Sequence, residues 1–206
     1  MADMEDESGA GEVADMASPR IAARERILRT GYDLFTRRGI RDVGVDEIIA
    51  RAKTAKSTFY KYFPSKTSLI LAVLELRQQI WTLDLVELQS RRLGGDDPGA
   101  QLLAIFDVFG AWFARADFDG CFFIKVLLEM GADHPAGAAS IKHLANVREI
   151  LRTRAERAHL VAPEVFASSL HQLMKGSILA AQEGEIGAAQ NARRMALLLI
   201  KSHQSV

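Results

Sequence analysis

The sequence predicts an all-α protein with an N-terminal helix-turn-helix domain joined by a long helix to a larger helical domain. Apolar residues recur every three or four positions in almost every segment, which is the period of an amphipathic helix. No segment alternates apolar and polar residues with the period of a strand. Clusters of glycine and proline, as in residues 94–99, separate the helical segments.

Charge is distributed unevenly along the 206 residues, although the net charge is zero. Residues 1–17 contain six acids, no base and no aromatic residue, so a disordered acidic tail is predicted. Residues 18–66 contain twelve bases and five acids, whereas residues 67–206 contain fourteen and fifteen. A concentrated positive charge is typical of a module that binds a polyanion. We therefore expect a DNA-binding domain at 18–66 and a second domain, for effector binding and dimerisation, at 67–206.

The stretch 54–66 combines cations, hydroxyl groups and aromatic rings more densely than any other segment. Phe59 and Phe63 lie one helical turn apart and are expected to attach a short helix to its own domain. Pro64 should end that helix, and Ser65 can cap the next one. The side chains left to bond phosphate or base edges are Lys56, Ser57, Thr58, Tyr60, Lys61, Tyr62 and Lys66.

Another short helix is predicted just upstream. Val45, Ile48 and Ile49 fall on one face of residues 45–52, and the three residues 53–55 join the two helices. This is the geometry of a helix-turn-helix, which places its second helix in the major groove of DNA. For the Lys-rich run taken alone, the alternative is a solvated helix start.

In these residues the sequence resembles the TetR family of bacterial transcription regulators, with a match that runs from Arg24 to Leu69. The resemblance implies phosphate contacts from one group of side chains and base contacts from another. The residues that carry it are Arg26-Ile27-Leu28, Tyr32-Asp33-Leu34-Phe35, Arg38-Gly39-Ile40, Val45, Ile48-Ile49-Ala50 and Lys56 to Lys66. The phosphate group is Thr58, Tyr60, Tyr62 and Lys66. The base-reading group is Lys56 and Ser57, with Lys61 as a further candidate.

The chain departs from the family pattern at three positions in the helix-turn-helix. Lys53 stands where a turn glycine is usual, Ala55 where a serine precedes the second helix, and Gly44 where a threonine or serine caps the first. A missing cap removes about 1 kcal/mol of helix stabilisation. Lys53 must also adopt the backbone conformation that the turn requires.

From Lys66 to about Leu93 the pattern predicts one long helix that connects the two domains. In the long helix that starts at Pro135, Ile141 is expected to face inward and Arg154 outward. Further helices are predicted over residues 100–116, 121–130, 135–159, 164–182 and 188–202.

Broad, adaptable apolar side chains are unusually frequent between residues 100 and 180, and they could line a site for an apolar or aromatic small molecule. The segment 120–124, with Glu129, His134-Pro135 and Gly176, also resembles one branch of the TetR family, which implies such an effector pocket. The alternative is an ordinary core. The pocket candidates are Phe106, Phe109, Trp112, Cys121, Phe122, Phe123, Met130 and Met174. Cys121 itself is either a thiol activated at a helix start or a buried inert one.

The last two helices are more apolar than a monomer can cover, most clearly over residues 195–200. A homodimer that packs these helices by two-fold symmetry would set two recognition helices about one DNA turn apart, roughly 34 Å. The predicted interface residues are Phe166, Leu170, Leu173, Gly176, Met195 and Leu198.

The sequence shows no pattern typical of a metal site, a cofactor site or an enzyme active site. The five histidines lack metal-ligand spacing, and no nucleophile, base or phosphate loop is signalled, so we expect no metal, no cofactor and no enzyme activity. One cysteine, no signal sequence and no apolar run near 20 residues suggest a cytoplasmic protein without a membrane partner. We expect a repressor released from double-stranded operator DNA by a small molecule. The alternatives are an activator, a ligand-independent DNA-binding protein, and a small-molecule-binding enzyme or carrier.

Overall fold

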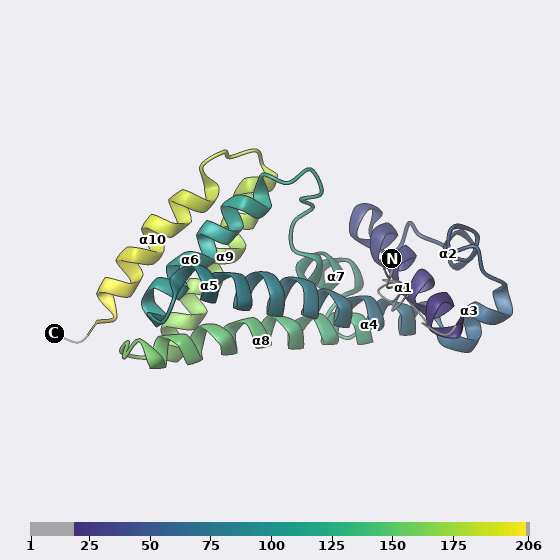
Figure 1. Cartoon of the computed structure of the whole chain (residues 1–206), viewed down its shortest axis with the longest axis horizontal. Helices are drawn as coiled ribbons and strands as arrows, with labels where there is room; N and C mark the ends of the chain where they lie inside the picture. Colours follow the sequence, from purple (N-terminus) through teal and green to yellow (C-terminus); the bar gives the residue numbers. More distant parts are fainter. Residues whose placement is uncertain (1–18, 205–206) are drawn as a thin grey trace, which may run out of the picture.

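The computed structural model describes residues 19–204, and within this range it consists of helices and connections without a strand. The predicted all-α fold is therefore confirmed. The molecule is elongated, with α1, α2 and α3 at one end and α10 at the other (Figure 1). The predicted acidic tail lies outside the described residues, and so does Ser18, which the sequence predicts to cap a first helix that begins at Pro19. No helix of residues 19–204 is long and apolar enough to cross a membrane.

The N-terminal unit contains α1 (Pro19–Arg38), α2 (Val45–Arg51) and α3 (Lys56–Tyr62). Gly39, with a φ of +84°, ends α1 because glycine adopts this left-handed conformation without steric cost. The unit's apolar side chains Ile27, Phe35, Ile48, Phe59 and Phe63 are buried, and they belong to an apolar core that continues into the C-terminal helices. The two phenylalanines of the recognition segment are thus buried, as predicted.

The connecting helix runs from α4 (Lys66–Arg77) through η1 (Gln78–Gln89) to α5 (Ser90–Gly94). Ser65 starts it with a capping box, in which Ser65 Oγ accepts from the Ser68 N–H and Ser68 Oγ accepts from the Ser65 N–H, both at 3.1 Å. The sequence predicts a continuous connecting helix, but it does not predict that η1 has the wider turn of a π-helix. In this wider register, Trp81 and Thr82 are both buried although they are adjacent in sequence.

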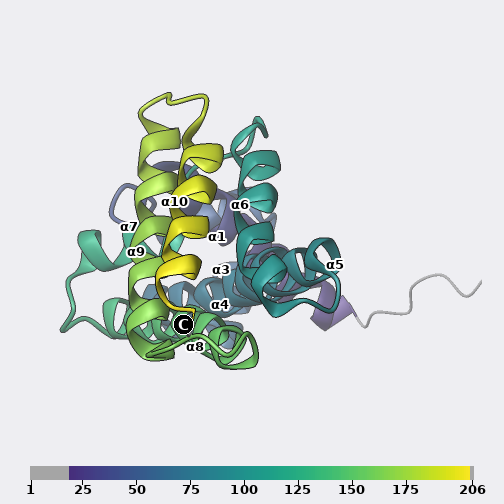
Figure 2. The same ribbon diagram turned by 90° about the vertical axis from the view of Figure 1, so that its left-hand side faces the viewer.

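The C-terminal domain contains α6 (Pro98–Phe113), α7 (Phe122–Met130), α8 (Pro135–Arg157), α9 (Pro163–Gln182) and α10 (Ala188–Ser202). Helices α9 and α10 lie side by side, with α6 against α10 (Figure 2). All five begin and end within a few residues of the predicted bounds.

Two side chains of α8 lie opposite to the prediction, since Ile141 is exposed and Arg154 is buried. The guanidinium of Arg154 donates to the Glu87 carbonyl at 2.8 Å and to Ser90 Oγ at 2.7 Å. A third, longer hydrogen bond goes to the Gln101 carbonyl at 3.4 Å, so polar oxygens from two helices compensate the buried cation. Periodicity alone does not reveal this compensation.

His171 of α9 is only 2% exposed, and its Nδ1 has no hydrogen-bond partner among the described residues. Burial, together with the smaller effect of the positive charges of Lys175 and Arg148, lowers the pKa of His171 to about 3. The folded protein therefore keeps the ring neutral, whereas the unfolded chain binds a proton below pH 6.5. The stability contribution is complete above pH 6.5 and is lost as the pH falls towards 3.

Lowering the pH from 7 to 5 should therefore decrease the free energy of unfolding by about 2 kcal/mol through His171 alone. Urea unfolding at the two pH values measures this loss. A His171→Leu variant should lose this part of the pH dependence, whereas His134→Asn, which keeps a side-chain helix cap, should retain it. Equal pH slopes for wild type and His171→Leu would contradict the assignment.

Candidate DNA-binding surface and ligand cavity

Helix α3 presents the predicted DNA-facing side chains on the outside of the N-terminal unit. Lys56, Ser57, Tyr60 and Lys61 are exposed. Thr58 and Tyr62 are half-buried, on the flanks of the face that buries Phe59. Lys56 Nζ lies 3.5 Å from the Asp46 carboxylate of α2, an exposed pair that contributes little to stability. The arrangement leaves a cationic, hydroxyl-bearing surface on a short helix.

The turn between α2 and α3 has a strained backbone at Lys53, where the sequence lacks the usual glycine. Lys53 has a φ of +49°, the left-handed conformation in which a glycine is usual. Neither Gly44 nor Ala55 provides a side-chain cap to the helix that it precedes. The helix-turn-helix therefore forms without the turn glycine and the side-chain helix caps that are usual at these positions in the TetR family.

Replacing Lys53 by glycine should raise the free energy of unfolding by about 0.5–1 kcal/mol, because it relieves a left-handed cost of about 1–2 kcal/mol and adds some chain entropy to the unfolded state. Thermal and urea unfolding measure the change. Lys53→Ala is the matched control, since it removes the same charge but keeps a Cβ. Equal stabilisation by alanine and glycine would show that charge, not backbone strain, determines the effect.

Lys66 differs from the exposed phosphate ligand that the sequence predicts. Its ammonium group donates to the Ile40 carbonyl at 2.5 Å and lies over the Phe35 ring. Burial lowers the pKa of Lys66, although the nearby carboxylates of Glu129 and Asp42 oppose this shift. The side chain turns inward because the carbonyl that follows Gly39 lies within its reach. In this conformation it joins α4 to the end of α1.

Helix α7 attaches the C-terminal domain to the same place. The Glu129 carboxylate accepts the backbone N–H groups of Ile40, at 2.9 Å, and Arg41, at 2.5 Å. One turn earlier, Lys125 Nζ donates to the Thr36 carbonyl at 3.3 Å. These contacts, all at the α1–α2 junction, couple the position of the helix-turn-helix to that of α7.

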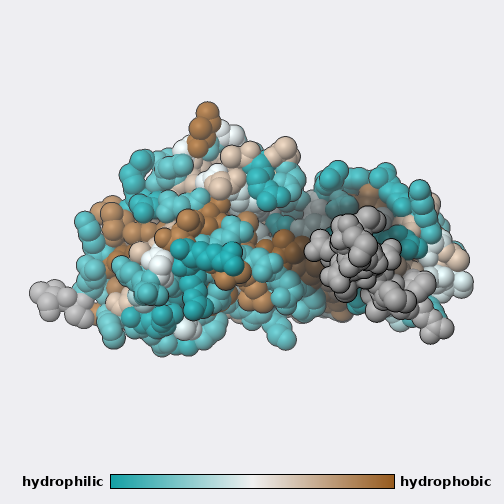
Figure 3. Space-filling model, viewed as in Figure 1, coloured by the Kyte–Doolittle hydropathy of each residue, from teal (hydrophilic) through white to brown (hydrophobic). Residues whose placement is uncertain are grey.

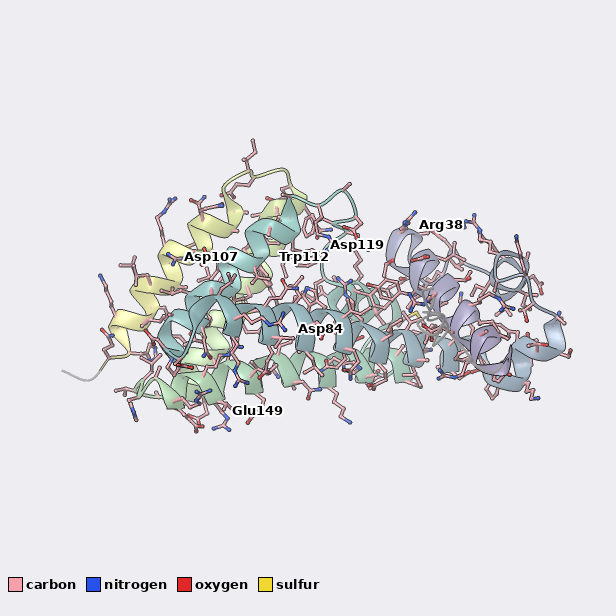
Figure 4. The ribbon with its side chains drawn as sticks, viewed as in Figure 1. Arg38, Asp84, Asp107, Trp112, Asp119 and Glu149 are labelled. Atoms are coloured by element: carbon pink, nitrogen blue, oxygen red, sulfur yellow. The ribbon has the colours of Figure 1, made fainter. Side chains whose placement is uncertain are left out.

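A cavity of about 670 Å³ lies between the two domains. Helix α1 contributes residues 32–37 to its wall, the connecting helix contributes residues 77–85, and the end of α6 with the following connection contributes residues 112–119. Figure 4 labels Trp112, near the end of α6, and Asp119, in the following connection. The volume is within the range of small-molecule sites, roughly 300–1,000 Å³. The lining residues are Tyr32, Asp33, Thr36, Arg37, Arg77, Ile80, Trp81, Leu85, Trp112, Arg115, Ala116, Asp117, Phe118 and Asp119.

Of the residues predicted for the pocket, Trp112 alone lines this cavity. The other aromatic candidates pack against one another and against Trp81 in the core, as in the Trp81–Phe109 pair at 6.0 Å and the Trp81–Phe123 pair at 6.1 Å. Burial raises the pKa of the Cys121 thiol, which corresponds to the inert alternative. The pocket candidates that lie in the core are Phe106, Phe109, Cys121, Phe122, Phe123 and Met174, with Met130 half-buried against it.

The cavity wall carries three arginines and three aspartates in distinct environments. Arg115 and Asp117 form an exposed ion pair at 2.7 Å, and the Arg115 hydrogen bond lowers the pKa of Asp117. Burial raises the pKa of the Asp119 carboxyl. Arg77 is 7% exposed and donates to the Tyr32 hydroxyl at 2.6 Å. Tyr32, Arg77 and Asp119 are not among the residues predicted from the sequence for this site.

The predicted interface residues of α9 and α10 divide into two groups. Phe166 and Leu170 are buried within the protomer, where they form part of its core, so they cannot be the covered surface. Met195 and Leu198 are 51% and 65% exposed, Gly176 is exposed and Leu173 is half-buried. Figure 3 shows apolar side chains on the surface of the C-terminal half, whereas the N-terminal end is mostly hydrophilic.

A helix-turn-helix unit carried on a helical domain defines a DNA-binding transcription regulator. Residues 27–73 match the family model for bacterial regulatory proteins of the tetR family. The crystal structure of reduced NemR from Escherichia coli has the same fold, with a TM-score of 0.74, 26% identity, and coverage of 86% of this chain and 97% of that one. Residues 27–73 therefore form a DNA-binding domain of the TetR type, and the chain as a whole has the fold of TetR-family transcription regulators.

Other similarities agree with this assignment. The HTH-type transcriptional repressor NemR of Escherichia coli is 29% identical over 108 residues, which are 52% of this chain and 53% of NemR. The transcriptional regulator AcuR of Cereibacter sphaeroides is 40% identical over 53 residues, 26% of this chain and 24% of AcuR. These alignments thus span about a quarter to a half of the curated relatives. A putative TetR-type regulator from Streptomyces avermitilis shares the fold, with a TM-score of 0.77, 24% identity, and coverage of 88% and 97% of the two chains.

Proposed function

We propose that this protein is a ligand-responsive repressor that binds a palindromic operator as a homodimer and leaves it when a small molecule occupies the cavity. The observation that carries the proposal is the composition of the cavity wall. One wall belongs to α1 of the DNA-binding unit, and the others belong to the connecting helix and the α6–α7 connection. An occupant would therefore contact both domains.

The same connection leads directly into the contacts that hold the DNA-binding unit. Residues 117–119 line the cavity, α7 begins at Phe122, and Glu129 near its end holds the backbone of residues 40 and 41. A shift of α7 would therefore move the end of α1 and, with it, the helix-turn-helix. Binding of two half-sites depends on the separation of the two recognition helices, so such a shift would lower operator affinity.

Operator binding measured with and without bound small molecule tests the proposal. Reciprocity requires that operator DNA weaken ligand binding by the same factor by which the ligand weakens operator binding, typically 5- to 150-fold. Equal ligand affinities for free protein and operator complex would exclude the allosteric mechanism. Stronger operator binding with ligand, or increased transcription from the occupied operator, would instead support the activator alternative.

The exposed side chains of α3 are expected to differ in role, with some binding phosphates and others contacting bases. Lys61 is a candidate for base reading from the sequence, but it lies in the last turn of α3, whereas the N-terminal residues of a recognition helix contact base edges, so we assign it to a phosphate. Lys61→Ala should weaken binding to all DNA sequences alike and flatten the slope of log K against log salt by about 0.9. Lys56→Ala or Ser57→Ala should instead relax discrimination at one base pair, by about 1–3 kcal/mol. Salt titrations with operator and mutated operator distinguish these effects. A uniform loss in all three variants would contradict the base-reading roles of Lys56 and Ser57.

Lys66→Ala is an informative comparison for the same experiment. Because Lys66 donates to the Ile40 carbonyl, its loss should act on the junction between α1 and α4. The salt slope should then change less for Lys66→Ala than for Lys61→Ala. A full decrease of about 0.9 for Lys66→Ala would indicate that its side chain turns outward to a phosphate on DNA.

A further inference from the structure

Arg77 is a buried cation in the cavity wall without an ion-pair partner among residues 19–204. Its Nη1 donates to Tyr32 Oη at 2.6 Å and its Nη2 donates weakly to the Gly120 carbonyl at 3.4 Å. These two neutral oxygens satisfy only part of the five N–H donors of a guanidinium. A charge that is 7% exposed and meets only neutral acceptors is costly unless an anion joins it.

The aspartates of the cavity wall do not neutralise the charge of Arg77. Asp117 is already paired with Arg115 at 2.7 Å, and Asp33 is exposed on α1. Burial raises the pKa of Asp119, although the positive charges of Lys125 and Arg77 oppose this shift, and its carboxyl group forms no ion pair with Arg77. The electrostatics of the buried wall therefore favour an anionic ligand.

The remainder of the wall is aromatic. The Trp112 ring lies 5.8 Å from Trp81 and 5.0 Å from Phe118, both edge to face, and Arg77 lies over it at 5.9 Å. Such a wall suits a flat or apolar ligand body, and the guanidinium beside it suits a carboxylate, which it can bind with two parallel hydrogen bonds.

We propose that the effector is a small organic acid, which places its carboxylate on Arg77 and its apolar or aromatic body against Trp112, Trp81 and Phe118. This inference rests on the proposed function, because it specifies the ligand class for the same cavity. The carboxylate competes with the Tyr32 hydroxyl for the guanidinium of Arg77. Occupancy of the cavity therefore changes a contact between α4 and α1.

The test compares three probes of one shape and different charge, namely 1-naphthoate, 1-naphthamide and 1-naphthylmethylammonium. Trp81 and Trp112 are the two tryptophans of the chain and both line the cavity, so their fluorescence reports binding to the full-length protein without DNA. The acid should bind about 10- to 100-fold more tightly than the amide, as expected for charge-assisted hydrogen bonds. The ammonium compound should bind most weakly.

The Arg77→Met variant should lose the preference for acid over amide, and Arg77→Lys should keep part of it. Arg92→Met is the matched control, because Arg92 is an exposed arginine of α5 outside the cavity wall, and its loss should change the preference by less than about 3-fold. If Arg77→Met does not fold, the relative affinities of the three probes for the wild-type protein still show whether the cavity prefers an organic acid.

Equal affinity for acid and amide, tighter binding of the ammonium compound, or no binding of the acid would overturn the inference. Operator binding is measured separately, so the two proposals fail in different ways. A neutral or cationic compound that weakens operator binding would support the proposed function and overturn the organic-acid assignment. Tight, Arg77-dependent binding of the acid without any effect on operator affinity would support the assignment and overturn the allosteric function.

Discussion

A variant that carries both Met195→Glu and Leu198→Glu is expected to be monomeric at micromolar concentration and to bind operator DNA about two orders of magnitude more weakly than wild type. Both side chains are at least half exposed on α10 and can be mutated without entering the protomer core. Two carboxylates introduced into an apolar interface would be buried without partners on each subunit. Loss of the dimer also removes the gain from engaging two half-sites at once.

Sedimentation equilibrium and salt-controlled gel shifts measure the two effects. Leu128→Glu is the control, because Leu128 is an apolar side chain of α7 that is 79% exposed, away from α9 and α10. It should leave both mass and operator affinity unchanged. A double variant that remains dimeric would show that another surface forms the interface.

The fold could be predicted closely from the sequence because its determinants are local. Pro19, Gly39, Pro64 and Ser65 mark helix ends through backbone restrictions and caps that involve only neighbouring residues. The recognition helix was predictable for the same reason, since Phe59 and Phe63 identify its buried face. The π-helical register of η1 was not predictable, because apolar spacing does not distinguish it from an α-helix over twelve residues.

Apart from Trp112, the cavity is lined by other residues than those predicted for the pocket. Abundant phenylalanines could indicate a pocket or a dense core, and the structure places most of them in the core. The better signal was Arg77, a charged residue at the next position of the apolar stripe formed by Leu69, Ile70, Val73 and Leu74. Its partner Tyr32 lies 45 residues earlier in the chain, so no local pattern connects the two. The contact of Glu129 with residues 40 and 41 is equally non-local.

Removing the Glu129 carboxylate should loosen the junction between α7 and the DNA-binding unit. Glu129→Ala leaves the N–H groups of Ile40 and Arg41 without their acceptor, and hydrogen bonds to a charged group are worth about 1.5–3 kcal/mol each. We expect a decrease of roughly 3 kcal/mol in the free energy of unfolding, since water can replace part of the loss at this half-exposed site. We also expect the ratio of operator affinities without and with ligand to fall towards one, because α7 no longer holds the end of α1.

Urea unfolding and operator titrations with and without ligand measure both changes. Glu149→Ala is the matched control, since Glu149 forms an exposed ion pair with Arg152 within α8 and contacts no other helix through it (Figure 4). It should cost less than about 1 kcal/mol and leave the coupling intact. Glu129→Gln should be intermediate, because its amide retains one acceptor oxygen but no charge. If Glu129→Ala loses stability but keeps full coupling, the signal from the cavity must instead reach the helix-turn-helix through α4, where Arg77 contacts Tyr32.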